Sequence, residues 1–160
     1  MIENIIYLDM ESDRNEEKKL FIVTPIGEKG SEIRDRTERV YANAIEPALR
    51  DRFNVKVSYL ICGADDINQT IMRHLQHDEL VIADLTGLNP NVFFEVGYRF
   101  ALEKDIIFIA EEGTKIPFDV STRRAYSYEV SDAGFIRLKD YLIEAVYNTQ
   151  HRGKFQDYEG

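Results

Sequence analysis

The sequence predicts an α/β fold, a flavodoxin-like three-layer sandwich with a five-stranded, mainly parallel sheet. Two observations predict it. Short apolar runs alternate along the chain with segments of helical spacing, and the runs are continuously apolar instead of alternating with polar residues. Continuous apolar runs are typical of strands covered on both faces, and strand–helix alternation is typical of parallel sheets. Such sheets bind ligands beyond the carboxyl ends of their strands.

The first half of the chain supplies two strands and two helices. The run from Leu20 to Thr24 stops at Pro25-Ile26-Gly27, which predicts the first core strand. Apolar residues at helical spacing predict a helix over 31–50, bent at Pro47. A strand-like segment follows at 55–61. Asp66 and Gln69 form a capping box that is expected to open a helix through His77.

The second half repeats the same order. We expect a strand at 80–83, a helix at 91–102, a buried strand at 105–110, and a final strand and helix at 125–130 and 131–148.

Length and composition indicate one domain. The chain has 160 residues, 44% of them hydrophobic and 31% charged, which suits one ordinary core and is short for two. We expect an N-terminal extension at 1–19, the α/β domain at 20–148 and a polar C-terminal tail at 149–160.

The charge and hydropathy of the chain limit which classes of partner are expected. A net charge of −9 repels phosphate backbones and anionic lipids, so neither nucleic acid nor a membrane is expected as a partner. No apolar run approaches the roughly 18 residues of a membrane span. Residues 1–10 carry acids where a signal peptide would carry basic residues, and the single cysteine cannot form an internal disulfide. We therefore expect a cytoplasmic protein.

Two carboxylates stand where a predicted strand meets a helix. Asp84 ends the strand, and Asn89 before Pro90 is a typical N-cap before a first helical residue. From there to residue 102 only Glu95 and Arg99 are charged, so most of this helix should be buried. Burial would raise the pKa of Glu95, whereas the helix N-terminus and Arg99 would favour its anion, and the pattern leaves the direction open.

Each carboxylate also has a purely structural interpretation. Glu95 and Arg99 are spaced i,i+4 and could form a surface ion pair. Asp84 could cap the loop that follows it by accepting an N–H from Thr86 or Gly87.

The stretches Phe21 to Gly27 and Ile82 to Tyr98 resemble the bacterial branch of the nucleoside 2-deoxyribosyltransferase-like and TIR-like superfamily, and the resemblance covers about 20–128. It implies that Glu95 contacts the ribose, as nucleophile or by stabilising an oxocarbenium-like centre while an N-glycosidic bond breaks. It implies that Asp84 helps to hold the sugar or base. Many TIR enzymes carry a tryptophan four residues before the glutamate, where this chain has Asn91.

The resemblance implies cleavage of a nucleotide N-glycosidic bond, with TIR-like NAD hydrolysis or cyclisation in bacterial signalling or defence as the first expectation. NAD would be a substrate, and no cofactor is required. The alternatives are a nucleoside deoxyribosyltransferase or deoxynucleotide N-hydrolase, and a non-catalytic nucleotide-binding or interaction module. The expected partners are a small-molecule nucleotide and further copies of the same chain.

Further residues are expected to bind the substrate. The loop from Thr24 to Ser31 contains two glycines and enters a helix N-terminus, which can present N–H groups to phosphate. Arg34 and Arg36 near that helix start suit an anionic ligand, or alternatively pair on a solvated face with Glu32, Asp35 and Glu38. The resemblance places the loop at the nucleotide site. The remaining expected substrate-binding residues are Thr24, Pro25, Ile26, Gly27, Asn89, Asn91, Phe118 and Asp119.

A metal site is not expected. His74 and His77 are spaced i,i+3 beside Asp78, but no third ligand converges on them in the predicted fold.

Overall fold

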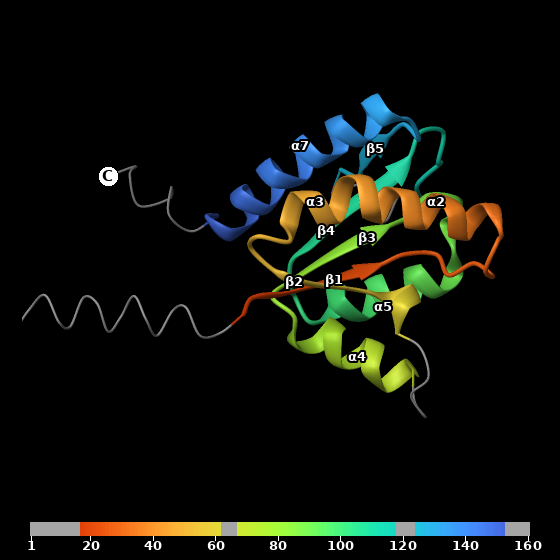
Figure 1. Ribbon diagram of the computed structural model, residues 1–160. Helices are drawn as coiled ribbons and strands as arrows, with labels where there is room; N and C mark the ends of the chain where they lie inside the picture. Colours follow the sequence, from red (N-terminus) through yellow and green to blue (C-terminus); the bar gives the residue numbers. More distant parts are fainter. Residues whose placement is uncertain (1–16, 62–66, 118–123, 153–160) are drawn as a thin grey trace, which may run out of the picture.

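Five parallel strands form one sheet in the order β2-β1-β3-β4-β5 (Figure 1). The computed structural model describes residues 17–61, 67–117 and 124–152. The order confirms the flavodoxin-like prediction and puts the topological switch point between β1 and β3. The strands are β1 (Lys19–Val23), β2 (Asn54–Val57), β3 (Leu80–Asp84), β4 (Ile106–Glu111) and β5 (Tyr126–Tyr128).

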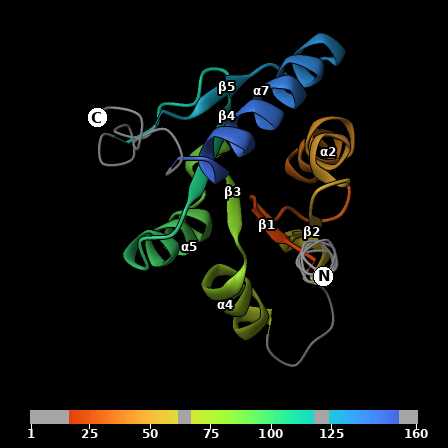
Figure 2. The ribbon, with the colours of Figure 1, turned by 90° about the vertical axis from the view of Figure 1, so that its left-hand side faces the viewer.

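Helices cover both faces of this sheet, which confirms the three layers. Figures 1 and 2 show α2, α3 and α7 on one face and α4 and α5 on the other. The helices are α2 (Glu32–Val40), α3 (Glu46–Leu49), α4 (Ile67–His77), α5 (Pro90–Ala101) and α7 (Asp132–Gln150).

Successive residues of a strand feed two separate cores. In β1, Leu20 and Ile22 pack in the cluster under α2 and α7, whereas Phe21 and Val23 pack in the cluster under α4 and α5. All four are buried. A strand whose two faces are both covered needs apolar residues at every position, which is why β1 is a continuous apolar run.

The predicted helix over 31–50 forms almost without interruption. Ser31 is its N-cap and accepts a hydrogen bond from the Arg34 N–H at 3.2 Å. A π-helical turn, Tyr41–Ile45, separates α2 from α3 just before Pro47. Proline has no N–H to continue the ladder, so the irregularity falls where the sequence predicts a bend.

Two predicted strands are shorter than expected. The second strand ends at Val57 instead of residue 61, and a 3₁₀ turn, Ser58–Leu60, follows. The Ser58 hydroxyl lies 3.4 Å from the N–H of Thr24 and 3.5 Å from its carbonyl, so this side chain draws the segment across the end of β1. The last strand ends at Tyr128, because Ser131 already caps α7. Asp66 lies outside the described residues.

A buried arginine, Arg99, links chain segments at the amino-terminal edge of the sheet, where the strands begin. Arg99 of α5 is 0% exposed and donates hydrogen bonds only to backbone carbonyls. The acceptors are Leu75 and Asp78, both at 2.8 Å, Glu79 at 3.1 Å, and Asp105 at 3.2 and 3.3 Å. They lie at the end of α4 and just before β3 and β4. None of the helices that the structure describes is long and apolar enough to span a membrane.

Candidate active site

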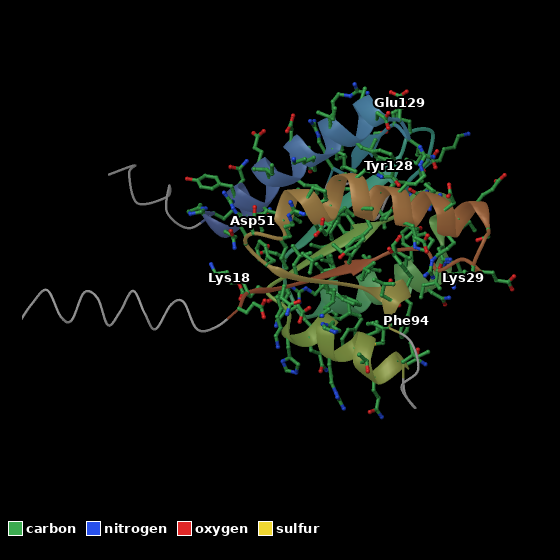
Figure 3. The ribbon with its side chains drawn as sticks, viewed as in Figure 1. Lys18, Lys29, Asp51, Phe94, Tyr128 and Glu129 are labelled. Carbon is green, nitrogen blue, oxygen red and sulfur yellow. The ribbon has the colours of Figure 1, made fainter. Side chains whose placement is uncertain are left out.

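The loops after β1 and β3 meet at the carboxyl edge of the sheet, beside the switch point. In Figure 3, Lys29 of the first loop and Phe94 of α5 lie toward the end to which the strands run, whereas Lys18 and Asp51 lie at the opposite end. Open parallel sheets bind ligands at such an edge. The carboxyl edge therefore contains the candidate site.

Asp84 is held in a buried hydrogen-bond network at the end of β3. It is 2% exposed. Its Oδ1 accepts from the Thr86 N–H at 3.0 Å and the Thr86 hydroxyl at 2.5 Å, and its Oδ2 accepts from the Tyr128 hydroxyl at 2.7 Å. The Thr86 hydroxyl also accepts from the Glu111 N–H at 2.8 Å. One carboxylate thus connects β3, the following turn, β4 and β5.

This network confirms the capping interpretation of Asp84, in which the carboxylate accepts the Thr86 N–H. Burial raises the pKa of the Tyr128 phenol far above its ordinary range, and the Asp84 charge raises it further. The hydroxyl therefore stays protonated and remains a donor. The role of Asp84 toward a sugar or base stays a prediction. Nothing local to Tyr128 in the sequence indicates a partner so distant along the chain.

The chain turns sharply between Asp84 and α5. Gly87 has φ of 71° and Leu88 has φ of 52°, so two successive residues adopt left-handed conformations. Asn89 then caps α5 as predicted, and its Oδ1 accepts the N–H groups of Asn91 at 2.9 Å and Val92 at 3.4 Å. Asn91 itself is exposed. Contacts of Asn89 and Asn91 with substrate stay predictions.

Glu95 is half-buried and has no hydrogen bond or ion pair within the described part of the chain. Burial raises its pKa from 4.5 to about 7. This resolves the direction that the sequence left open, because desolvation exceeds the influence of the helix N-terminus. The ion pair with Arg99 does not form, since that guanidinium is turned to the carbonyls at the amino edge.

The neighbours of Glu95 show which way it faces. Tyr98, three residues further along the same side of α5, receives a short hydrogen bond from Gln76 of α4. Glu95 lies one helical turn nearer the carboxyl edge than this contact. A carboxylate without a partner, on the α4 side of α5 and close to the ligand-binding edge, is the strongest candidate for chemistry in the described structure.

The loop after β1 is closely packed. Thr24 and Pro25 are buried, and the Thr37 hydroxyl donates to the Pro25 carbonyl at 3.4 Å. A Cβ on Gly27 would lie 2.5 Å from the Ser31 hydroxyl oxygen and 2.9 Å from the Arg34 nitrogen, so only glycine fits over the start of α2. Ile26 projects outward and is exposed. Gly27 thus covers the Arg34 N–H, which already donates to the Ser31 hydroxyl of the helix cap.

The Arg34 side chain has partners inside the protein. Its Nε lies 2.5 Å from Glu38 Oε1, and its guanidinium lies 4.2 Å from the centre of the Tyr59 ring. The alternative interpretation, pairing with Glu38, is thus observed, and an anionic ligand of Arg34 stays a prediction. Thr24, Pro25, Ile26 and Gly27 lie together at the carboxyl edge, but no described contact tests them as substrate ligands. Phe118 and Asp119 lie outside the described residues.

The histidines that prompted the question of a metal have other contacts. His74 Nδ1 lies 2.8 Å from Asp78 Oδ2, and its ring stacks on Phe21 with centroids 4.6 Å apart. Within residues 17–61, 67–117 and 124–152, no group of three or more His, Cys, Asp or Glu side chains could hold a metal ion.

Solved structures with this fold include an N-glycosidase and a deoxyribosyltransferase. A CMP N-glycosidase, BcmB, from Clostridium botulinum is 16% identical over 78% of this chain and 99% of its own, with a TM-score of 0.53. A 2-desoxiribosyltransferase from Leishmania mexicana is 16% identical over 84% of this chain and 98% of its own, with a TM-score of 0.51. Neither a protein-family profile nor a curated protein matches the sequence significantly. At this identity, the likeness shows a shared fold.

We predict that Tyr128→Phe destabilises the protein by about 1–3 kcal/mol, because it leaves buried Asp84 Oδ2 without its donor. Urea denaturation of the two proteins measures the difference. Tyr126→Phe is the matched control, since its ring stacks on Tyr141 and no described contact uses its hydroxyl. Equal losses in both variants would contradict the importance of the Asp84 network.

We predict that Glu95→Gln stabilises the protein at pH 8 and has little effect at pH 4. Between pH 4.5 and about 7 the folded carboxyl keeps a proton that the unfolded chain has released, so raising the pH through this window lowers wild-type stability. Because Glu95 is partly exposed, the difference above pH 7 should be on the order of 1–2 kcal/mol.

Urea denaturation at pH 4, 6 and 8 checks this pH dependence. Exposed Glu103, just beyond α5, provides the control Glu103→Gln. A stability difference between Glu95→Gln and wild type that stays constant from pH 4 to pH 8 would show that the Glu95 pKa is not raised.

Proposed function

We propose that this protein is an enzyme that breaks the N-glycosidic bond of a small nucleotide or nucleoside, with Glu95 as the catalytic residue. The observation that carries the proposal is the half-buried, unpaired carboxylate of Glu95 beside the ligand-binding edge, with a pKa raised to about 7. A pKa in this range keeps both protonation states accessible near neutral pH, as acid–base and nucleophilic chemistry requires.

The reaction matches this residue. As the C–N bond breaks, its electron pair leaves with the base and positive charge develops on the sugar C1. The Glu95 anion stabilises this charge or bonds to C1. Water or a second base then attacks C1, displaces Glu95 where it has bonded, and gives up a proton that goes to the departed base, which completes hydrolysis or transfer. Removal from water strengthens the interaction between the carboxylate and the developing charge. The proposal requires no cofactor.

The fold supports the same class of reaction. Both named structures share the sheet and its helices with this chain, and their names describe an N-glycosidase and a deoxyribosyltransferase. Among substrates, we favour a nucleoside or nucleoside monophosphate over NAD, because Asn91 stands where many TIR enzymes carry a tryptophan. NAD hydrolysis or cyclisation in signalling or defence is the second candidate, and it rests on the TIR half of the resemblance.

We predict that Glu95→Gln lowers the rate of base release by at least ~100-fold, because it removes the charge that stabilises the sugar cation. The purified protein is incubated with ribo- and deoxynucleoside monophosphates, with deoxynucleosides plus a second free base, and with NAD, and released base is followed by chromatography. Wild-type kcat should rise with pH through about 7, where Glu95 becomes an anion.

Glu103→Gln is the control and should keep the wild-type rate. Equal base release by wild type and Glu95→Gln would remove Glu95 from the mechanism. Base exchange without NAD cleavage identifies a transferase, and NAD cleavage alone identifies the second candidate. Nucleotide binding by calorimetry with no turnover of any substrate would instead support a non-catalytic binding module.

We also propose that copies of this chain associate through the outward face of α5. Phe94 is 66% exposed there, Gly97 and Ala101 are exposed beside it, and no exposed charge lies between them. A Cβ on Gly97 would meet nothing within 4 Å, so no contact among the described residues requires this glycine. A mid-helix glycine costs about 1 kcal/mol relative to alanine, and its lack of a side chain suits close approach of a second helix.

We predict that Phe94→Glu converts an oligomer into monomers, because a twofold interface would bring the two new charges together. Light scattering coupled to size-exclusion chromatography measures the mass. Ile136→Glu on α7 is the control, since Ile136 is equally apolar and exposed. A wild-type protein that is monomeric at high micromolar concentration would contradict this association.

A further inference from the structure

Two arginines on the helices are mostly buried, but one is well hydrogen-bonded and the other is not. Arg99 donates to four backbone carbonyls. Arg36 of α2 has a side chain only 15% exposed, yet its Nε and Nη2 are fully buried and have no hydrogen-bond partner. Leaving a charged donor buried without a partner costs more than leaving a neutral one. Arg36 is therefore the group in the described structure whose partner is most clearly missing.

The nearest charge to Arg36 is a poor substitute for that partner. Arg36 Nη1 lies 3.5 Å from Glu111 Oε2 at the end of β4. Charge-assisted N–H···O bonds are normally about 2.7–2.9 Å long, so this contact is an ion pair without a good hydrogen bond. The Glu111 side chain is 38% exposed and can turn toward water. The guanidinium is thus paired only loosely, with a group that is free to leave.

A cavity of about 560 Å³ lies beside Arg36, between the start of α2 and the ends of β4 and β5. Its charged lining consists of two arginines, Arg36 and Arg39, and three carboxylates, Glu32, Asp35 and Glu111. The volume is in the usual range for small-molecule sites. Arg36 and Arg39 line this cavity, which also reaches the N-cap Ser31, where the dipole of α2 favours an anion. The α2 carboxylates, Glu32 and Asp35, are exposed to solvent. Of the two arginines that the sequence selects, Arg36 lines the cavity and Arg34 does not.

We propose that this cavity is a phosphate subsite and that Arg36 is the residue that binds the phosphate group of the substrate. A phosphate oxygen replaces Glu111 as the partner of the guanidinium, and the Glu111 carboxylate turns to solvent. The planar fork of arginine suits two phosphate oxygens at once. This inference rests on the proposed function and specifies its substrate class: a phosphorylated nucleotide instead of a free nucleoside.

The cavity also adjoins the network that holds the candidate site. The N–H of Glu111 donates to Thr86, whose hydroxyl contacts Asp84, so the backbone at the floor of the cavity is part of that network. Because the backbone is held there, release of the Glu111 side chain leaves β4 in place.

Binding of inorganic pyrophosphate to the full chain tests the subsite without any turnover. Calorimetry is performed at constant ionic strength, with sodium chloride replacing the ligand in the reference. We expect Arg36→Gln to weaken binding by at least 10-fold. Glu111→Gln removes the competing carboxylate and should tighten binding by about 3-fold or more. Arg73→Gln, an exposed arginine of α4 on the other face of the sheet that does not line the cavity, should leave binding unchanged.

Arg36→Gln and Glu111→Gln are expected to change pyrophosphate affinity in opposite directions, so the proposal stays falsifiable even if Arg36→Gln fails to fold. Glu111→Gln leaves Arg36 intact, and Arg36→Lys keeps the charge while losing the planar fork. Unchanged binding in Glu111→Gln, or equal weakening in Arg73→Gln and Arg36→Gln, would overturn the subsite. An Arg36 that only balances the buried Asp84 charge would give loss of stability in Arg36→Gln with no change in pyrophosphate affinity.

Substrate kinetics separate this inference from the proposed function. With a phosphorylated substrate, Arg36→Gln should raise KM at least 10-fold while kcat changes little, and with the matching nucleoside it should change neither. Pyrophosphate binding that depends on Arg36, without base release from any substrate, would sustain the subsite and refute the enzyme. Base release that depends on Glu95 but not on Arg36 would support the enzyme and refute the subsite.

Discussion

The buried carboxylate of Asp84 is the interaction on which the carboxyl edge of this protein depends. Through Thr86 and Tyr128 it joins β3 to the ends of β4 and β5. With the turn held there, the left-handed residues Gly87 and Leu88 direct the chain to Asn89, where α5 begins. The position of Glu95 relative to the sheet follows from this sequence of contacts, because a helix that starts at a defined residue presents its side chains in defined directions.

The buried charges on the helices differ in whether the protein itself supplies them with hydrogen-bond partners. Arg99 is buried at little cost because backbone carbonyls satisfy it. Glu95 and Arg36 are buried without such partners, and both lie toward the edge where parallel sheets bind ligands. Unsatisfied charge is costly to a folded protein, and sites that bind or transform a ligand are where such a cost is retained. A nucleotide would supply a positive sugar centre to one residue and a phosphate to the other.

Much of the architecture is predictable because it depends on local patterns. The continuous apolar runs identify β1, β3 and β4 closely, and the cap at Asn89 lies where the sequence predicts it. The second strand was predicted too long, because the bond between Ser58 and Thr24 connects segments that lie 34 residues apart. An ion pair between Arg99 and Glu95 remained one of two interpretations of the sequence, because spacing within a helix is visible in a sequence and the direction of a buried guanidinium is not.

The sequence by itself determined the α/β class, the order of elements, the cap of α5 and the selection of Glu95 as the carboxylate of interest. Only the tertiary structure decided that Glu95 is unpaired with a raised pKa, that Asp84 is held by Tyr128 from 44 residues away, and that two buried nitrogens of Arg36 lack a hydrogen-bond partner whereas Arg34 pairs with Glu38. The physical reason is the separation along the chain over which each interaction acts. Periodicity and capping act within a few residues, whereas desolvation and buried hydrogen bonds depend on which distant segments the fold brings together.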